Sequence, residues 1–586
     1  MSGTFVQFWR FGLVCLCVLT AFGWVFHRLY ELHVVLAPEY AAQAESHRRT
    51  LVRLEPRRGD IRDSRGELLA GTRPVVDLGI DPHIFPDEAL PRLGELARLL
   101  GMDADELARL ATTRTRGVEG TPAARPVRWV KLAEVDDATY EAAMAMRIRG
   151  VYGNRRFLRH YPAGSLAAHI TGFLNREETA VLGVESHFDF YLRGQPGWKV
   201  SENDGRRREI AAFRNREAPP GNGYSVVLTI DSVIQSFVEE EIANLVGEYS
   251  PEGVSIIVSD PRDGSILAMA NHPTFDPNQF WDFPIENQRN RAVTDVYEPG
   301  SVFKIVPVAA ALEERLVNRG TVIDCSLPVV EYAGRAVRLP SDVRPLGELP
   351  LSAVVSRSSN RGSAIIGMML GSQRLHAWCE RFGFGAPTGW VLGGEVSGRL
   401  HPVRAWDGLT ISRLPAGYAV SVTPLQMHKG MSVIAGGGYL RAPFVVKEVV
   451  DRGGEKVMVY RPSEGRRVLS AETAAEMADL LAGVVGPEGT ARRAQVAGFE
   501  VAGKTGTSRK ILNGRYSERH HIASFSGFFP AGEPRVVVTV VVDDAKTPGT
   551  SYGGVVAAPA FQRIGERIVR YLNLEPVSSP PVASNP

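Results

Sequence analysis

One apolar run near the N-terminus constrains this chain more than any other feature. Residues Phe11–Phe26 are uncharged and mainly apolar, with Arg10 before them and His27 and Arg28 after them. The run is shorter than the roughly 20 residues that usually cross a bilayer, but snorkelling of the flanking arginines lengthens it. A cleaved signal peptide would need small residues directly after the run, and a core helix would be amphipathic. We therefore expect a single membrane anchor, with nearly all of the chain on one side of the membrane.

The charge of the chain is almost balanced, with 67 basic and 65 acidic residues and a net charge of +2. This balance argues against a strongly basic nucleic-acid binder, so no nucleic acid is expected as a partner. Seven arginines nevertheless gather after the anchor: Arg48, Arg49, Arg53, Arg57, Arg58, Arg62 and Arg65. They either contact membrane headgroups or partner proteins, or form a solvated surface with ion pairs to Glu55, Asp60 and Asp63.

The four cysteines form neither a zinc-ribbon nor a disulfide-framework pattern. Two lie in the apolar run, and Cys325 and Cys379 are 54 residues apart without a C-x-x-C pairing. Two buried free thiols and a single Cys325–Cys379 disulfide both remain open.

Lysine is rare in this chain, with 9 lysines against 58 arginines. Arginine stays protonated in proteins, whereas lysine can lose its proton when it is buried. The few positions that keep lysine are therefore candidates for an amine with a chemical role. Lys304 and Lys504 are two of them, and both lie in the motifs described below.

The segments from residue 223 onward predict one antiparallel sheet covered by helices. Ser225–Ile230 is strand-like, and Asp231 is a good N-cap for the amphipathic helix that follows. Apolar strands on either side of a DPRDG turn and of an AGEP turn predict two hairpins, and Pro559–Leu574 predicts a closing helix. Strands at both ends of the segment, with helical sequence between them, indicate an α+β domain.

Three short motifs that can carry chemistry stand in order along this domain. They are Ser301-Val302-Phe303-Lys304, Ser358-Ser359-Asn360 and Lys504-Thr505-Gly506-Thr507. Each motif alone is a weak signal, because short patterns occur by chance in a long chain. Their order, together with the structural context of each, carries the argument.

The first motif places a hydroxyl at the start of a helix. Pro299-Gly300 forms a turn and an apolar run follows, so the free N–H groups at Ser301 favour a developing negative charge. Lys304 lies one turn further on the same face. A serine hydroxyl needs an adjacent base, and a shielded lysine can have its pKa lowered enough to serve. Taken alone, Ser301 could equally be an ordinary N-cap and Lys304 a surface charge.

The second motif lies in a polar stretch between helix-like segments. In a catalytic interpretation, Ser358 relays a proton to the leaving amine, and Asn360 holds the substrate amide and the Lys304 amine. In isolation the same residues would be read as an ordinary polar loop.

The third motif follows a strand-like segment, FEVAG. Gly506 has no side chain, so a peptide substrate can pair alongside as an added strand. Thr505 and Thr507 can then receive the terminal carboxylate of the substrate, and Lys504 supplies positive potential. The backbone N–H groups of Thr507 and Ser301 are the natural oxyanion hole. The alternative is a strand end followed by a polar turn.

With these residues assembled, the chain resembles the class B penicillin-binding proteins and, within them, the cell-division D,D-transpeptidases. The three motifs are a known signature of penicillin-binding proteins, although Ser359 replaces the Asp of S-D-N. The resemblance extends to RNRAVTDVYEPGSVFK, LAMANHPTFDPNQF, YAVSVTPLQM and SYGGVVAAPAF in the C-terminal part, and to RRGDIRDSRGELLA, RHYPAGSLAAHITGF and GVESHFDFYLRGQPG in the N-terminal part. One departure is Ser64, which separates Asp63 from the arginine that often follows it in the family.

The resemblance implies a single transmembrane helix, an elongated mixed α/β pedestal and a transpeptidase domain with a central antiparallel sheet. We expect a cytoplasmic tail at 1–10, the anchor at 11–27, a non-catalytic, dimerisation-like pedestal at 28–222, the transpeptidase domain at 223–575 and a disordered tail at 576–586.

The resemblance also implies the reaction. Ser301 is acylated by stem peptides ending in D-Ala-D-Ala, the terminal D-Ala leaves, and an amine on a neighbouring strand takes the acyl group. β-Lactams acylate the same serine, and no metal or cofactor is used. The implied location is the outer side of the cytoplasmic membrane at the division septum, with a SEDS-type glycan polymerase and divisome proteins as partners.

Rival interpretations differ in domain content. A β-lactamase would be a single catalytic domain, and a class A enzyme would need a deacylating Glu that the sequence between Asn360 and Lys504 does not offer. A β-lactam sensor would need a multi-span signalling domain, and a catalytically idle division scaffold would not need every motif side chain. An elongation-type transpeptidase shares the same chemistry, so residues alone do not separate it from a division enzyme.

Overall fold

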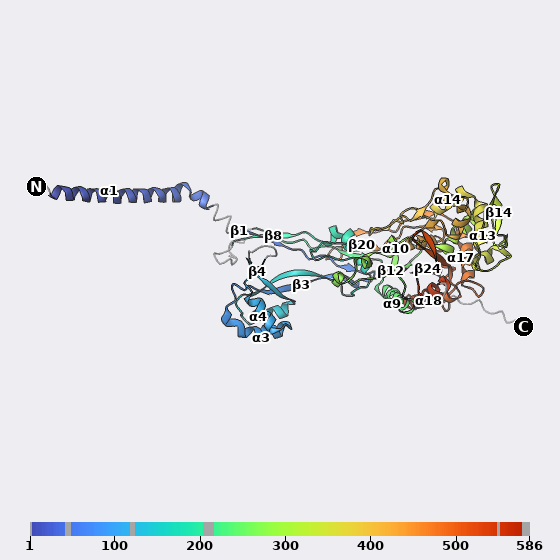
Figure 1. The fold of residues 1–586 in the computed structure, drawn as a ribbon, viewed down its shortest axis with the longest axis horizontal. Coiled ribbons are helices and arrows are strands. Elements are labelled where there is room, and N and C mark those ends of the chain that lie inside the picture. Colours follow the sequence, from blue (N-terminus) through green and yellow to red (C-terminus); the bar gives the residue numbers. More distant parts are fainter. Residues whose placement is uncertain (1–2, 42–48, 118–123, 203–215, 548–550, 577–586) are drawn as a thin grey trace. The chain divides into compact units, whose positions relative to one another are not determined.

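The computed structural model describes residues 3–41, 49–117, 124–202, 216–547 and 551–576. The chain forms two units, drawn in Figure 1: Met1–Arg57 with Gly194–Asn222, and Arg58–Arg193 with Gly223–Pro586. All but the first residue of the tail predicted at 576–586 lies outside the described residues.

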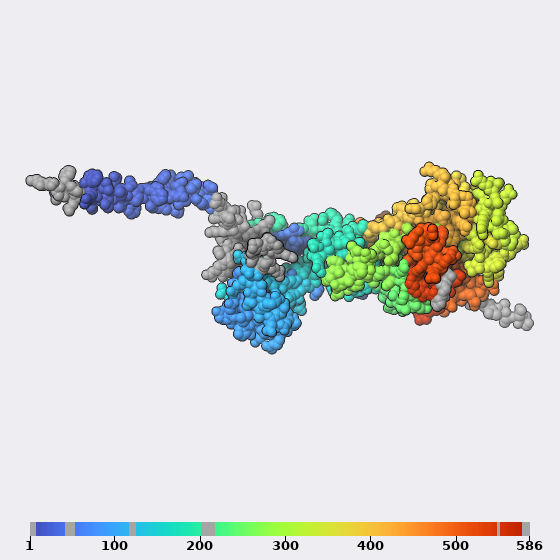
Figure 2. Space-filling model, viewed as in Figure 1, coloured from blue at the N-terminus to red at the C-terminus, as the bar shows by residue number. Residues whose placement is uncertain are grey.

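The smaller unit contains the helix that the apolar run predicts. Helix α1 spans Gly3–Tyr30, and a π-helical turn, η1, continues it over Glu31–Val35. The segment Phe8–Val35 is long and apolar enough to cross a membrane, and its large apolar side chains are exposed (Figure 2). These properties are compatible with a single-pass anchor. An antiparallel sheet completes the unit, in the order β1 (Arg49–Leu54), β8 (Gly197–Glu202) and β9 (Arg216–Ala218).

A small α/β layer occupies the first part of the larger unit. Strand β3 (Leu68–Ile80) pairs antiparallel with β6 (Val130–Val135) and with β7 (Val151–His160). Three helices bury apolar residues against this sheet: α3 (Leu93–Leu100), α4 (Ala104–Thr112) and α5 (Asp137–Ala145). The short elements of this layer are η2 (Asp87–Arg92), β4 (Thr115–Gly117) and β5 (Ala124–Pro126).

The sheet that contains β3 also joins segments far apart in the sequence. Strand β2 (Ile61–Arg62) pairs antiparallel with β3 and parallel with β10 (Ser225–Leu228). Strand β10 pairs in turn with β20 (Val446–Val450), which pairs with β21 (Lys456–Val459). Early and late parts of the unit therefore share one buried core around Ile61, Val226 and Val449.

A buried ion cluster lies beside this core. The Glu185 side chain, on α7 (Gly183–His187), is fully buried. Its carboxylate accepts hydrogen bonds from Arg58 Nε at 2.7 Å, Arg159 Nε at 2.6 Å and the Tyr161 hydroxyl at 3.2 Å. Two guanidinium groups thus compensate a carboxylate that would be costly to bury alone. The neighbouring short helices are α6 (Ala168–Thr171) and α8 (Asp189–Leu192).

Several arginines of the arginine-rich stretch form ion pairs with nearby carboxylates. Arg53 pairs with Glu55 at 2.9 Å, and Arg62 pairs with Asp60 at 2.7 Å. Other pairings differ from the predicted ones, because Arg58 pairs with Glu185 and Asp189, and Arg65 pairs with Asp231. The Asp63 carboxylate instead accepts hydrogen bonds from Ser232. Arg48 lies outside the described residues.

A five-stranded antiparallel sheet organises the rest of the unit, as predicted. Its order is β12 (Ile266–His272), β11 (Gly253–Ser259), β25 (Val536–Asp543), β24 (Arg515–Phe529) and β23 (Ala502–Leu512). Phe525 of β24 packs edge-on against Phe561, while the next residue, Ser526, bonds to Thr539, which bonds to His428. Neighbouring residues of a strand point to opposite faces, so helices cover both sides of the sheet. Helices α9 (Ser232–Tyr249) and α18 (Gly553–Tyr571) lie on one face, and α16 (Pro424–Ala435) and α17 (Ala471–Val485) on the other.

Two details differ from the sequence expectation. Helix α18 begins six residues before Pro559, which therefore lies inside it. Strand β23 carries the third motif, as the catalytic interpretation requires, but it begins only at Ala502, so most of the strand-like FEVAG segment lies before it. Cys325 and Cys379 are both buried and free, so the disulfide alternative does not hold in this structure.

The unit also contains helices and short strands outside the sheets and helices described above. The larger helices are α11 (Ile305–Glu313), α12 (Leu351–Ser356), α13 (Asn360–Leu370) and α14 (Ser372–Arg381). The short ones are η4 (Pro277–Asp282), η5 (Ile285–Gln288), α10 (Arg291–Thr294), η6 (Gly300–Lys304), β13 (Val322–Asp324), β14 (Val329–Tyr332), β15 (Arg335–Arg338), β16 (Glu348–Pro350), β17 (Arg399–Leu400), η7 (Val403–Ala405), α15 (Thr410–Arg413), η8 (Leu414–Ala416), β18 (Val420–Ser421), β19 (Tyr439–Leu440), β22 (Arg466–Arg467) and η9 (Arg492–Ala494).

The buried ion cluster yields a stability prediction. Glu185→Ala leaves Arg58 and Arg159 without their buried carboxylate, which we expect to cost about 3–5 kcal/mol of unfolding free energy. Thermal unfolding of the full chain in detergent measures the change. Glu464→Ala, in an exposed loop far along the chain, is the control. An unfolding temperature for Glu185→Ala equal to that of the control would contradict the role of the cluster.

Candidate active site

The nucleophile candidate lies in a tight helical turn. Residues Gly300–Lys304 form the 3₁₀ turn η6, which runs directly into α11. In a 3₁₀ turn, side chains three residues apart are nearly eclipsed, so Ser301 and Lys304 lie on the same face. Ser301 is partly exposed, whereas Lys304 is buried with 3% of its surface accessible.

Three glycines allow this turn to press against its neighbours. A Cβ on Gly506 of β23 would lie 2.7 Å from Val302 Cγ2 and 2.8 Å from the Pro299 carbonyl oxygen. Gly300 has φ +56°, and a Cβ there would lie 2.9 Å from the Thr507 carbonyl oxygen. A Cβ on Gly417 would lie 1.9 Å from the Gly300 carbonyl oxygen. The residues on both sides of Ser301 therefore touch β23 at the third motif.

The second motif lies in the connection between α12 and α13. Ser358 has φ +60°, a left-handed conformation that is uncommon for a non-glycine residue and often marks a functional site. Ser359 is the N-cap of α13, and its hydroxyl accepts a hydrogen bond from Gly362 N–H at 3.0 Å. This geometry turns the Ser358 side chain away from the helix.

Hydrogen bonds join the three motifs into one cluster. The Lys304 amine donates to the Ser358 carbonyl at 2.5 Å, to Ser358 Oγ at 3.2 Å and to Asn360 Oδ1 at 2.7 Å. The Lys504 amine donates to the same Ser358 Oγ at 2.8 Å. Within the described part of the chain Ser301 Oγ makes no hydrogen bond, so it lies beside this cluster without being bonded to it. Catalytic hydrogen bonds often tighten only when substrate binds.

Both lysines of the cluster have depressed pKa values. Burial, and then the positive charge of Lys504, hold the pKa of Lys304 well below its usual range. Burial lowers the pKa of Lys504 to about 7. Two amines this close to one hydroxyl are not both readily protonated, and the lowered pKa of Lys304 favours the neutral form that can accept a proton.

The third motif lies on β23, which is an edge strand of the five-stranded sheet. The Thr505 hydroxyl bonds to the Thr490 hydroxyl at 2.9 Å, and Thr507 Oγ1 accepts a hydrogen bond from Gly553 N–H at 3.1 Å. Residues two apart on a strand share a face, so Thr505 and Thr507 point the same way. Because β23 is the terminal strand of the sheet, its outer edge can accept an added strand.

Asp342 is a site residue that the sequence analysis missed. Its carboxylate accepts hydrogen bonds from the Asn360 N–H and from the Ser359 hydroxyl, the latter at 2.9 Å. The neighbouring Ser341 carbonyl accepts from Asn360 Nδ2 at 2.7 Å. Ser359 in place of the motif's usual Asp was the available signal, because it raises the question of which other carboxylate supports the loop.

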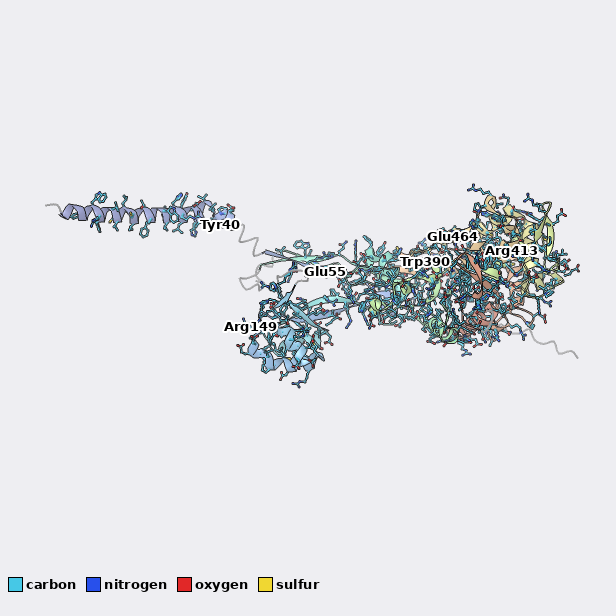
Figure 3. The ribbon with its side chains drawn as sticks, in the orientation of Figure 1. Tyr40, Glu55, Arg149, Trp390, Arg413 and Glu464 are labelled. Atoms are coloured by element: carbon cyan, nitrogen blue, oxygen red, sulfur yellow. The ribbon has the colours of Figure 1, made fainter. Side chains whose placement is uncertain are left out.

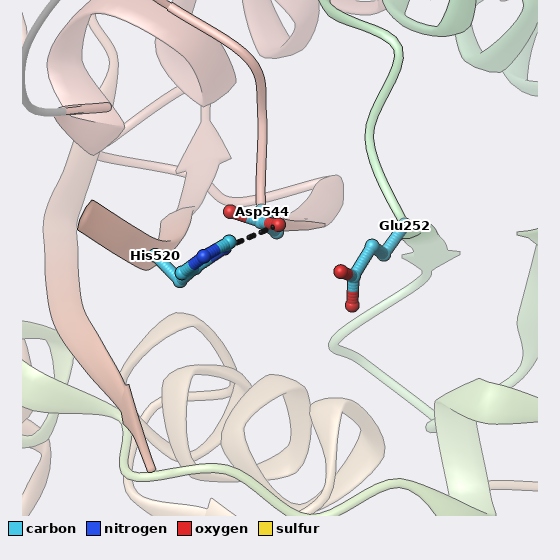
Figure 4. Close-up of side chains that lie close together, drawn as sticks. All are labelled: Glu252, His520 and Asp544. Carbon is cyan, nitrogen blue, oxygen red and sulfur yellow. Dashed lines mark hydrogen bonds and ion pairs between the residues drawn. The ribbon is translucent and has the colours of Figure 1, made fainter. Parts of the chain in front are cut away.

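A second group of polar side chains lies away from these motifs. Potential ligand atoms of Glu252, His520 and Asp544 lie within 4.8 Å of one another (Figure 4). Lys510 forms an ion pair with Glu252, and Lys546 forms one with Asp544. The two ammonium groups already balance both carboxylates, so we interpret the group as an ion-pair network.

Two protein-family models match the chain. The penicillin binding protein transpeptidase domain matches residues 254–566, and the penicillin-binding protein dimerisation domain matches residues 53–228. Stage V sporulation protein D of Bacillus subtilis is 34% identical over 528 residues, which cover 89% of this chain and 79% of the relative. Peptidoglycan D,D-transpeptidase FtsI of Escherichia coli K12 is 30% identical over 574 residues, which cover 97% and 92%.

Solved structures are similar over most of the chain. A peptidoglycan synthetase from Bifidobacterium adolescentis gives a TM-score of 0.69 at 26% identity, covering 91% of this chain and 98% of that structure. Penicillin binding protein 3 from Mycobacterium tuberculosis, complexed with aztreonam, gives 0.66 at 28% identity, covering 90% and 99%.

The lysine pKa values predict a pH profile for labelling by a penicillin. Lys504 should hold the reagent's carboxylate only while it is protonated, so the labelling rate should fall as the pH rises through about 7. An ordinary lysine, with a pKa near 10.4, would give no fall below about pH 9. The rate of labelling by a fluorescent penicillin, measured from samples quenched at set times between pH 6 and 8, tests this prediction. Lys429→Arg removes another lysine of lowered pKa and should leave the profile unchanged, whereas a flat wild-type profile would contradict the assignment.

Proposed function

This chain belongs to the class B penicillin-binding proteins and is a serine-type peptidoglycan D,D-transpeptidase, and from that premise we propose the role of each site residue and a role in division. Ser301 is the nucleophile, Lys304 its base, Ser358 the proton relay and Asn360 the holder of amine and substrate amide. Lys504 with Thr505, Gly506 and Thr507 binds the donor peptide. The observation that carries this proposal is the bonding of two buried lysine amines to the Ser358 hydroxyl.

The first half-reaction forms an ester on Ser301. The Ser301 oxygen attacks the carbonyl of the penultimate D-Ala, and its proton passes to the neutral Lys304 amine. The N–H groups of Ser301 and Thr507 stabilise the oxyanion. The C–N bond to the terminal D-Ala then breaks, and the leaving amine takes a proton relayed through the Ser358 hydroxyl, so that D-Ala departs and the base is restored.

The second half-reaction transfers the acyl group. The amine of a neighbouring stem peptide attacks the ester carbonyl and loses one proton to the Lys304–Ser358 pair. The C–O bond to Ser301 breaks, and the serine oxygen recovers a proton from the same pair. A new amide cross-links two strands, and the free enzyme is regenerated. A β-lactam follows only the first half, because its leaving group stays attached.

Mass spectrometry after fluorescent penicillin labelling tests the nucleophile. We expect one adduct, on the peptide that contains Ser301, and a loss of labelling of more than about 10³-fold in Ser301→Ala, as for other nucleophile deletions. Ser356→Ala, at the end of α12, is the matched control and should retain labelling. An adduct on any other residue would overturn the assignment.

We further propose that the chain acts at the division septum. The support is the resemblance of VTDVYEPGS and VTPLQ to division enzymes. On this proposal the chain is a single-pass protein of the inner membrane with its catalytic domain outside the cytoplasm. Its tail is residues 1–10, its anchor 11–27, its pedestal 28–222 and its catalytic domain 223–575. A SEDS-type glycan polymerase and divisome proteins are its proposed partners.

A fluorescent fusion separates division from elongation. We expect signal at midcell during constriction, because a septal enzyme is needed only there. Fusion to the cytoplasmic N-terminus keeps the catalytic domain free, and the Ser301→Ala form controls for recruitment by activity. Uniform signal along the side wall would identify the elongation alternative, and midcell signal with no labelling of Ser301 by penicillin would identify an idle scaffold.

A further inference from the structure

A half-buried carboxylate lies three residues before the nucleophile. Glu298 precedes the Pro299–Gly300 turn, and its carboxylate accepts hydrogen bonds from Ala419 N–H at 2.9 Å and from the Tyr516 hydroxyl at 2.9 Å. The rings of Tyr516 and Tyr418 are perpendicular, with centroids 6.5 Å apart. Glu298 thus lies next to the turn that carries Ser301, beside the side chains of Tyr516 and Tyr418.

The Glu298 carboxylate has no direct ion-pair partner: among the described residues, no lysine, arginine or histidine pairs with it. Two arginines act on the neighbouring Tyr418 from further away, namely Arg413 (labelled in Figure 3) and Arg509, which pairs with Glu518 at 2.8 Å. Burial raises the pKa of the Glu298 carboxyl group, which reflects the cost of holding a charge there. Partly desolvated charges that lack a direct ion-pair partner are candidates for ligand recognition.

The direction of the donor peptide brings it past this carboxylate. We place the terminal carboxylate of the donor peptide at Thr505 and Thr507 and pair the peptide antiparallel to β23. The N-terminal part of the peptide then lies beside the later residues of β23. Tyr516 pairs in register with Ile511, four residues beyond Thr507, and its hydroxyl reaches Glu298. At about 3.3 Å per residue, the side chain directly upstream of the D-Ala pair lies on this side of the site.

The chemistry of cross-linking supplies a cation at that position. In the proposed second half-reaction the acyl group goes to an amine of a neighbouring stem peptide, which we take to be a side-chain amine, and donor and acceptor strands belong to one polymer. The donor therefore carries the same amine on its own stem, and it is protonated in water near neutral pH.

We propose that Glu298 binds the protonated side-chain amine of the donor stem peptide, on the residue upstream of D-Ala-D-Ala. This inference rests on the proposed function and extends it to donor selection. A bound ammonium group has no free lone pair, so the donor's own amine is also kept from attacking the acyl-enzyme. Only an amine from a second strand is then a nucleophile.

A structural role makes a different prediction. Ala419 has φ +60°, and its N–H bond to Glu298 could serve only to hold the loop that contacts Gly300. The amide oxygen of a glutamine accepts the same bond, so Glu298→Gln preserves that role and removes only the charge. Glu298→Gln therefore separates charge recognition from loop support.

Acylation by two matched donors tests the proposal. The probes are depsipeptides that end in D-Ala-D-lactate and carry the upstream side-chain amine either free or acetylated. Intact-protein mass spectrometry follows ester formation on Ser301 of the full chain in detergent, with each rate divided by that for fluorescent penicillin. We expect the wild type to prefer the free amine by about tenfold, and Glu298→Gln to lose that preference. Glu533→Gln, in the exposed turn between β24 and β25, is the control and should keep it.

Each outcome decides a separate question. No preference in the wild type, a preference retained in Glu298→Gln, or a preference lost in Glu533→Gln would overturn the role of Glu298. Failure of penicillin to label Ser301 would instead overturn the proposed function itself. A lower unfolding temperature in Glu298→Gln with the preference intact would leave only the loop-support role.

Discussion

The site depends on two lysine amines being buried around a single serine hydroxyl. Lys304 and Lys504 both reach Ser358 Oγ, and both are almost fully enclosed by apolar packing. Desolvation alone lowers the pKa of any buried amine. The charge of a second amine nearby lowers the pKa of the first one further, so that one amine can be neutral while the other is charged. In the proposed mechanism, a base and an anion-binding group therefore arise from the same residue type. Arginine could fill neither position, because it does not release its proton.

The sheet and the helices around it hold that pair in place. Lys504 comes from an edge strand, Lys304 from a helical turn and Ser358 from a loop between two helices. These segments are separated by many residues, and only the packed core between the sheet and the α11–α17 region keeps them together. The strained backbone of Ser358 persists because its neighbours are fixed on both sides. The chemistry thus depends on tertiary packing more than on any one motif.

Sequence analysis predicted much of this arrangement because local signals were strong. The Asp231 cap, both hairpins and the turn before Ser301 follow from turn chemistry and hydrophobic periodicity, and the structure has each of them. What it could not predict were pairings made only in three dimensions. Arg65 forms an ion pair with Asp231, which is distant in the sequence. The Asp342 carboxylate accepts a hydrogen bond from the Asn360 N–H, and Asp342 lies in a loop without any recognisable motif. The start of β23 was also misplaced, because the strand-like FEVAG segment pairs with β24 only from Ala502 onward.

The close backbone contacts around Ser301 have an evolutionary consequence. Gly300, Gly417 and Gly506 meet at distances that leave no room for even a methyl group. A lineage under antibiotic selection therefore cannot narrow the drug's entry by enlarging a residue there without also displacing the turn that carries Ser301. Adaptation is confined to segments that border the groove without entering this three-way contact, or to the quantity of enzyme the cell produces.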